Sequence, residues 1–224
     1  MDGTIGPRGE KSEVVAHERP ELLMVCAVAG FLGTLAPMVT IVWAAEVTDH
    51  DFIADTVSDL ARGPRKNIMD AGFYINAAGM LGLAIAAAHA HLGRAAWSCG
   101  TFCLAFVALV VVLLGLWDEF HTAENNPPGM TVHTKLTFFL APLYLAGPIL
   151  MAGGAKGVAP RYATAFHVAA GGWIVFAVAF KLAPSGYDGL MEKIALSATV
   201  LWTLPLSWLF FRRGYAKAHR LNPG

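Results

Sequence analysis

Residues 97–117 read WSCGTFCLAFVALVVVLLGLW and contain no charged side chain. A helix of about 20 apolar residues is long enough to cross the hydrocarbon core of a bilayer. Further runs of similar character lie at about 22–45, 71–92, 134–154, 162–183 and 191–211. Because only helices and closed barrels satisfy every backbone polar group in lipid, the pattern predicts an all-α, polytopic membrane protein with a bundle of six transmembrane helices.

The composition of the whole chain supports the same class of protein. Of the 224 residues, 56% are hydrophobic and only 14% are charged, and the mean hydropathy is +0.53. Soluble domains carry about 25% charged residues, so a soluble globular protein is excluded. The formal net charge is zero, which sets aside a nucleic-acid partner. Cys26, Cys99 and Cys103 form no CxxC pair and lie in apolar runs, which argues against a disulfide framework or a zinc ribbon.

The distribution of lysine and arginine predicts the orientation of the helices. Ten of the sixteen basic residues fall on the side of the N-terminus, in the tails and in two short loops. Cytoplasmic segments carry an excess of lysine and arginine, so this side is expected to be cytoplasmic. We therefore expect a single membrane domain over 1–224, with both termini in the cytoplasm and short polar tails at 1–21 and 212–224.

The first long loop, on the opposite side, carries a helical pattern. Phe52, Ile53, Thr56, Val57 and Leu60 recur at helical spacing between acidic residues. This pattern predicts a short amphipathic helix that lies on the membrane surface. Long ordered loops are usually functional, so we expect a site at this outer face.

Small and aromatic residues in the apolar runs predict how the helices pack. Gly72, Gly79 and Gly82 permit close approach of the second span to a neighbouring helix, and we interpret them as packing residues. Asn76, in the same span, is interpreted as a residue that forms a helix-to-helix hydrogen bond rather than as a ligand. The six tryptophans fall mostly near span ends and are interpreted as residues of the interfacial belts.

Several short motifs resemble those of a known family. They are VSDL at 57–60, Phe73, Asn76, Asp118, His133 and GLMEKI at 189–194. With these motifs the chain is similar to the six-helix bacterial membrane family called domain of unknown function 998, which is distantly similar to Frag1/DRAM-type proteins. The resemblance implies the six-helix fold, a polar site and a multi-pass location in the bacterial cytoplasmic (inner) membrane. It implies no particular reaction.

Polar residues from different segments gather at the predicted outer face. They are Ser58, Asp59, Asp70, Asn76, Asp118, His121, His133, Asp188 and Glu192. One interpretation is that they mark the boundary with water. The other is that they converge on one site, because ionisable groups at membrane depth are costly unless they are paired, hydrated or bound to a metal.

Metal binding is the sharper hypothesis for this cluster. Asp118 and His121 are three residues apart and share a helical face if the third span extends past Trp117, and His133 opens the fourth span. Two imidazoles and a carboxylate suit a divalent metal such as zinc with one open position. Around such a metal or another ligand, we expect further contacts from Ser58, Asp59, Asn76 and Glu192. For Ser58 itself, a helix N-cap is favoured over a nucleophile.

The predicted inner face carries a second group of histidines and cysteines. His89 and His167 lie about one turn inside their spans and could be axial ligands of a macrocycle such as haem. The alternative is interfacial histidines beside buried apolar cysteines, and we expect no bound cofactor here.

Three classes of function stay open, and no enzyme activity is assigned. A ligand-binding or metal-binding protein with a non-catalytic accessory or scaffold role in a membrane complex is slightly favoured, with the lipid bilayer and other membrane subunits as its partners. The alternative is a metal-dependent hydrolase that acts on lipid or envelope substrates. A small-solute carrier is third, because the sequence has neither acidic residues at midspan nor an inverted repeat.

Overall fold

We describe the protein from a computed structural model, in which the described residues are 18–61, 63–116, 132–184 and 186–221. All of their regular structure is helical. The elements are α1 (Pro20–Glu46), α2 (Val57–Leu60), the 3-10 turn η1 (Gly63–Arg65), α3 (Lys66–Ala90), α4 (Ala95–Leu116), α5 (Val132–Lys156), α6 (Pro160–Leu182) and α7 (Asp188–Leu221).

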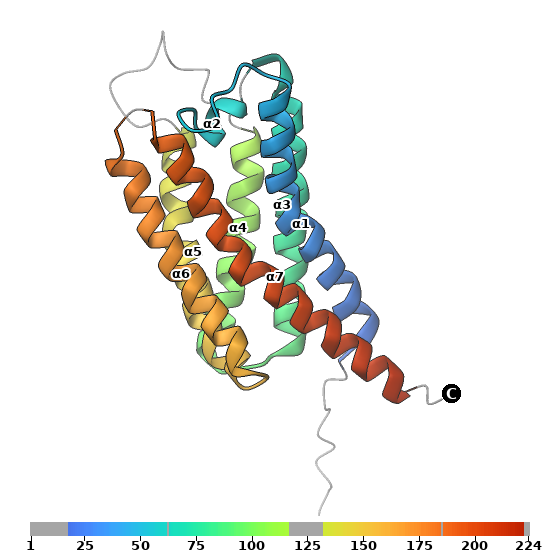
Figure 1. Cartoon of the computed structure of the whole chain (residues 1–224). Coiled ribbons are helices and arrows are strands. Elements are labelled where there is room, and N and C mark those ends of the chain that lie inside the picture. The colour runs from blue at the N-terminus through green and yellow to red at the C-terminus, as the bar shows by residue number, and fades with distance from the viewer. Residues whose placement is uncertain (1–17, 62, 117–131, 185, 222–224) are drawn as a thin grey trace, which may run out of the picture.

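Six helices in the described part of the chain are long and apolar enough to cross a membrane, namely α1 and α3 to α7. Each packs against the next along the chain, and α7 packs against α1, so they form a closed ring. Figure 1 shows α2 at one end of the bundle and the last turns of α7 at the opposite end, where α1 begins. The fold class predicted from the sequence, a bundle of six membrane-spanning helices, is confirmed.

The last helix is longer than its apolar run. The sequence predicts a span that ends at about 211 and a polar tail from 212, but α7 continues to Leu221. Basic side chains are favourable in the last turns of a helix because the C-terminal end of its dipole is negative. The extension also packs closely on α1, since a Cβ at Gly214 would lie 2.7 Å from the Pro20 carbonyl oxygen.

The crossing of α1 and α3 depends on small residues, as the sequence predicts. A Cβ at Gly79 would lie 2.6 Å from the Cα of Gly33, and a Cβ at Gly33 would lie equally close to the Cα of Gly79. The two backbones therefore touch at this point. Asn76 donates from Nδ2 to the Gly33 carbonyl oxygen at 2.8 Å, which is the helix-to-helix hydrogen bond favoured from the sequence.

The tryptophans do not all belong to interfacial belts. Trp97 and Trp202 are fully buried, and Trp173 is 9% exposed, whereas Trp43 and Trp208 are more than half exposed. Two of these three indoles bond to backbone carbonyls, since the Nε1 of Trp97 donates to Ala87 and the Nε1 of Trp173 donates to Ala141. The Nε1 of Trp202 is buried without a hydrogen-bond partner among the described residues. Position near a span end therefore did not predict whether a tryptophan lies in an interfacial belt, because the helices pack around the rings of Trp97, Trp173 and Trp202.

The amphipathic helix predicted in the first loop is much shorter than its pattern suggests. Only Val57–Leu60 is helical, and Phe52 and Ile53 lie outside it and are exposed. Asp51 explains the break, because its carboxylate accepts the backbone N–H groups of Ile53 and Ala54 and holds a separate turn. These two hydrogen bonds lower the pKa of Asp51 below its usual range.

An ion pair joins the beginning of α1 to the end of α7. Glu18 accepts two hydrogen bonds from Arg213, at 2.7 and 3.1 Å, and lies 3.5 Å from the Lys217 ammonium. Burial raises the pKa of the Glu18 carboxyl, but the hydrogen bonds and charge of Arg213, together with Lys217, outweigh this effect and leave the pKa below its usual value.

This pair is expected to make stability depend on pH. A carboxyl whose pKa is lower in the folded state contributes stability above its unfolded pKa of about 4.3, and the contribution is lost as the pH falls through the folded pKa. The difference in free energy of unfolding between the wild type and Glu18→Gln should therefore be constant from pH 7 to pH 6 and shrink towards zero on acidification. Thermal unfolding of the two proteins across this range measures it, and a difference that grows with acidity would contradict the assignment.

Candidate functional site

A cavity of about 370 Å³ lies inside the ring of helices, in the half of the bundle near α2. All six long helices contribute to its wall, which is mostly apolar. Met38 of α1, Met80 of α3, Tyr144 of α5 and Trp173 of α6 are among its lining residues. Cavities of about 300–1,000 Å³ lined by apolar side chains with a few polar groups are typical of small-molecule sites.

The end of this cavity near α2 carries its most distinctive polar contact. Ser58 comes from α2, and His133 comes from the first turn of α5, seventy-five residues further along the chain. The Ser58 hydroxyl oxygen lies 2.9 Å from the His133 Nε2, and both residues line the cavity. His133 is only 9% exposed, so this imidazole is held within the protein rather than in bulk water.

The position of Ser58 depends on how α2 is anchored. Glu192, near the start of α7, accepts a hydrogen bond of 2.6 Å from the Val57 backbone N–H and also lines the cavity. Within α2, the Thr56 hydroxyl caps the Asp59 N–H, and the Asp59 carboxylate accepts the Thr56 N–H in return. The N-cap is therefore Thr56, and the interpretation of Ser58 as the cap was wrong. The Ser58 hydroxyl is instead available to His133.

Lys193, which follows Glu192 in α7, holds the loop before α2 in place. Lys193 is 6% exposed, and its ammonium donates to the Asp55 carbonyl oxygen at 2.6 Å. The same ammonium lies 4.9 Å from the centre of the Phe52 ring. Gly189 lies directly against the Asp55 backbone, where any side chain would overlap the carbonyl group. Two adjacent residues of α7, an acid and a base, thus hold this loop over the cavity.

A histidine of the same loop lies among these charges. Burial lowers the pKa of His50, and the nearby Lys193 ammonium lowers it further, although Asp55, at 3.7 Å, opposes this effect. The net effect is a pKa below the usual value for histidine.

Most of the outer-face residues predicted to support a ligand meet at this cavity. Ser58, Asn76, His133 and Glu192 all line it, whereas Asp59 caps α2. Asp118 and His121, the other two predicted metal ligands, lie outside the described residues. Within the described ranges, no group of three or more histidine, cysteine, aspartate or glutamate residues could hold a metal ion.

Several polar residues of this region were not predicted from the sequence. Thr137 and Lys181 line the cavity, and Lys193 holds the loop above it. A lysine at the start of an otherwise apolar span was the available signal for Lys193, because a charge there needs partners. Thr137 gives no such signal, because a threonine hydroxyl in a helix can donate to a carbonyl oxygen of the same helix. The Thr137 hydroxyl does so, to the Thr134 carbonyl oxygen.

The histidines at the other end of the bundle do not converge on a site. The His89 Nε2 accepts the Arg19 backbone N–H at 2.6 Å, which ties α3 to the residue before α1. His167 is exposed on α6. Cys26 and Cys103 are buried, Cys99 is exposed, and all three are free thiols.

The ring of spanning helices and its internal cavity define a multi-pass helical membrane protein with a candidate small-molecule site. Residues 24–209 match the sequence profile of the family described as "Protein of unknown function (DUF998)". The chain belongs to this family, as the resemblance of its motifs predicted. Searches of curated proteins and of solved structures gave no match.

Proposed function

We propose that the protein binds a small amphipathic molecule in the cavity, with its apolar part among the helices and its polar group at Ser58 and His133. The observation that carries this proposal is the Ser58–His133 contact at one end of an otherwise apolar cavity. An apolar wall favours a hydrocarbon group, and a hydroxyl beside an imidazole can donate to and accept from a polar head. Binding without catalysis agrees with the accessory role in a membrane complex that the sequence favours.

Ligand-induced stabilisation tests this proposal. Buried Cys26 and Cys103 become reactive on unfolding, so a thiol-reactive dye can report the transition in a Cys99→Ser background. A medium-chain monoacylglycerol at 100 times its dissociation constant should stabilise the protein by about 2.7 kcal/mol. An alkane of the same chain length, added at the same concentration, should stabilise the protein less. It binds more weakly because it cannot form hydrogen bonds with Ser58 or His133.

A matched pair of variants on α6 shows whether the effect comes from the cavity. Ala177 lines the cavity, so Ala177→Phe should fill it and remove the stabilisation by monoacylglycerol. Val175 is 60% exposed and does not line it, so Val175→Phe should leave the stabilisation unchanged. Equal stabilisation of both variants would overturn the proposal.

Ester hydrolysis is a second candidate function, favoured by the geometry of the same contact. With Nε2 unprotonated, His133 can take the proton of the Ser58 hydroxyl as this oxygen attacks an ester carbonyl. The proton then passes to the leaving alcohol, and water releases the acyl group from Ser58. A fluorophosphonate probe should label the wild type and Ser207→Ala but not Ser58→Ala, and labelling that survives Ser58→Ala would exclude this mechanism.

A divalent metal such as zinc on Asp118, His121 and His133 is a further proposal for this end of the bundle. Because the His133 Nε2 faces Ser58, the metal would use Nδ1 or displace the serine hydroxyl. Stoichiometric metal in the purified protein that is lost in His133→Ala would support the proposal, and a folded, mildly purified protein without metal would overturn it.

We propose that the end carrying the termini faces the cytoplasm of a bacterial inner membrane, because it carries most of the basic residues. In a cysteine-free background, a cysteine at Gly63 should react with an impermeant thiol reagent in intact spheroplasts, and a cysteine at Gly157 should not. Both positions are exposed. The reverse pattern would place the Ser58–His133 cavity at the cytoplasmic end.

A further inference from the structure

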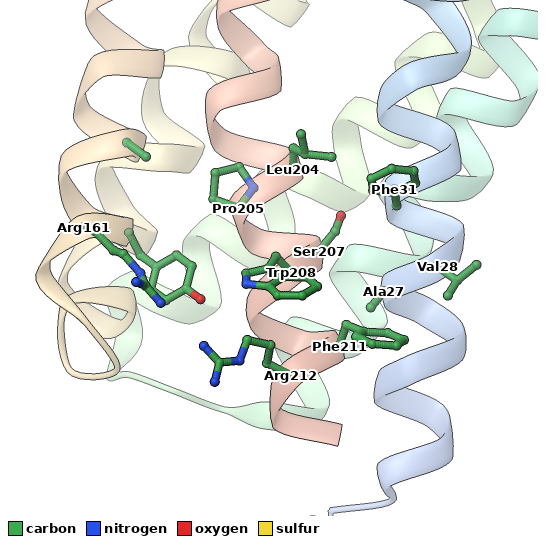
Figure 2. A pocket seen from close by; sticks show the side chains of 12 residues that line it. Ala27, Val28, Phe31, Arg161, Leu204, Pro205, Ser207, Trp208, Phe211 and Arg212 are labelled. Carbon is green, nitrogen blue, oxygen red and sulfur yellow. The ribbon is translucent and has the colours of Figure 1, made fainter. Parts of the chain in front are cut away.

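A second hollow, of about 830 Å³, lies on the outside of the bundle between α1, α6 and α7, near the end that carries the termini. It shares no lining residue with the internal cavity. Figure 2 shows its apolar walls, with Phe31 on α1 and Leu204, Trp208 and Phe211 along α7. Trp208 is 54% exposed, so its indole faces the surroundings of the bundle. This surface is a groove that lipid chains can reach from the membrane.

Two arginines lie at the end of the groove near the termini. Arg161 is in the first turn of α6, and Arg212 is in the extended part of α7. Figure 2 shows the Arg212 guanidinium in the space between these two helices and the Arg161 guanidinium beside α6. The Cζ of Arg161 lies 5.5 Å from the centre of the Tyr162 ring. The groove thus has an apolar length and a doubly positive end.

The charges of these two arginines are not balanced within the described chain. Neither forms an ion pair with a described residue, whereas the neighbouring Arg213 is paired with Glu18. The lining of the groove includes no aspartate or glutamate among the described residues. Guanidinium groups bind phosphate oxygens through two parallel hydrogen bonds, so an anionic phosphate group fits this end of the groove.

We propose that the groove binds an anionic glycerophospholipid, with its phosphate between Arg161 and Arg212 and an acyl chain along Phe31, Leu204 and Trp208. A zwitterionic lipid would bring an ammonium group towards the two arginines with no carboxylate among the described lining residues to receive it. A lipid with a neutral head beyond its phosphate, such as phosphatidylglycerol, keeps its net negative charge at the arginines. The lipid also contacts α1, α6 and α7 and so stabilises the packing of α7 against α1, where the ring of helices closes.

Quenching of Trp208 by brominated lipids tests this proposal. The protein is placed in phosphatidylcholine vesicles that contain a minor fraction of either dibrominated phosphatidylglycerol or dibrominated phosphatidylcholine. The difference between the wild type and Trp208→Phe isolates the fluorescence of Trp208 from that of the other tryptophans. We expect brominated phosphatidylglycerol to quench this fluorescence several-fold more than brominated phosphatidylcholine at the same fraction.

Charge-matched variants separate a site from a generally basic surface. Arg161→Gln with Arg212→Gln should reduce the ratio of the two quenching values to about one. Arg94→Gln with Lys156→Gln removes the same charge from exposed positions at the same end and outside the groove, and should leave the ratio unchanged. Thermal unfolding checks that both double variants are folded.

Four results would overturn the proposal. Equal quenching of the wild type by the two lipids would show no preference, and an equal loss in the Arg94/Lys156 variant would show a diffuse charge effect. Competition by millimolar inorganic phosphate alone would show a phosphate site rather than a lipid site. Protection of Trp208 from both lipids, with cross-linked dimers, would show that a second copy of the chain covers the groove.

Discussion

Replacing Gly79 with leucine is expected to destabilise the protein by about 3 kcal/mol, the upper end of the usual cost of overpacking. The reason is that a Cβ at this position would lie 2.6 Å from the Cα of Gly33. A neighbouring side chain could rotate away, but a backbone cannot, so α1 and α3 must separate. Separation also breaks the hydrogen bond from Asn76 to the Gly33 carbonyl oxygen.

Gly153→Leu is the matched control for this prediction. Gly153 lies within α5, and a Cβ there would meet no atom within 4 Å. We expect this variant to unfold close to the wild-type temperature, with thermal unfolding in detergent as the measurement. Equal destabilisation by the two substitutions would show that the α1–α3 contact is not specially dependent on small residues.

Glu192→Ala is expected to detach α2 from α7 and to destabilise the protein by about 1–3 kcal/mol, the cost of leaving a buried hydrogen-bonding group unpaired. The Val57 N–H would lose the carboxylate oxygen that it now contacts at 2.6 Å. Ser58 follows Val57 directly, so its contact with His133 should loosen as well. Hydrogen exchange at residues 56–60 should become faster, because α2 then loses its hydrogen bond to α7.

Glu192→Gln separates the hydrogen bond from the charge. The glutamine side chain keeps a carbonyl oxygen that can accept the Val57 N–H, so exchange at residues 56–60 should stay close to the wild-type rate. If Glu192→Gln were as damaging as Glu192→Ala, the negative charge rather than the hydrogen bond would hold α2.

The sequence predicted the spans well because crossing a membrane is a one-dimensional constraint. Length and hydropathy locate α4 from residues 97–117 without any tertiary information. The role of Asn76 was also predictable, since an amide within an apolar span must find a partner. Its particular partner, Gly33, was not predictable, because that depends on which helix crosses α3 at this height.

The misjudged features depend on contacts between distant segments. Periodicity in 52–60 indicated one helix, but the Asp51 carboxylate and the Thr56 cap divide the segment into a turn and a short helix. The continuation of α7 beyond its apolar run was not predicted, because the Glu18 ion pair holds a basic stretch against α1 that hydropathy alone does not place.

The candidate site was predictable as a region but not as a set of contacts. Topology placed Ser58, His133 and Glu192 at the same end of the bundle, and all three line one cavity. Hydropathy gave no sign of the cavity itself, because apolar residues that line a hollow have the same composition as those that fill a core. The pairing of Ser58 with His133 depends on Glu192, which holds α2 in place across more than 130 residues of chain.

The most direct test of the central claim is to measure the mass of any molecule that stays bound in the cavity. Native mass spectrometry would be applied to protein purified in mild detergent, in an Arg161→Gln/Arg212→Gln background so that lipid in the outer groove does not contribute. We expect a bound amphipathic molecule, after purification or after incubation with monoacylglycerol, in this background and with Val175→Phe but not with Ala177→Phe. The same bound mass in the Ala177→Phe protein, or none in any of the three, would contradict the account.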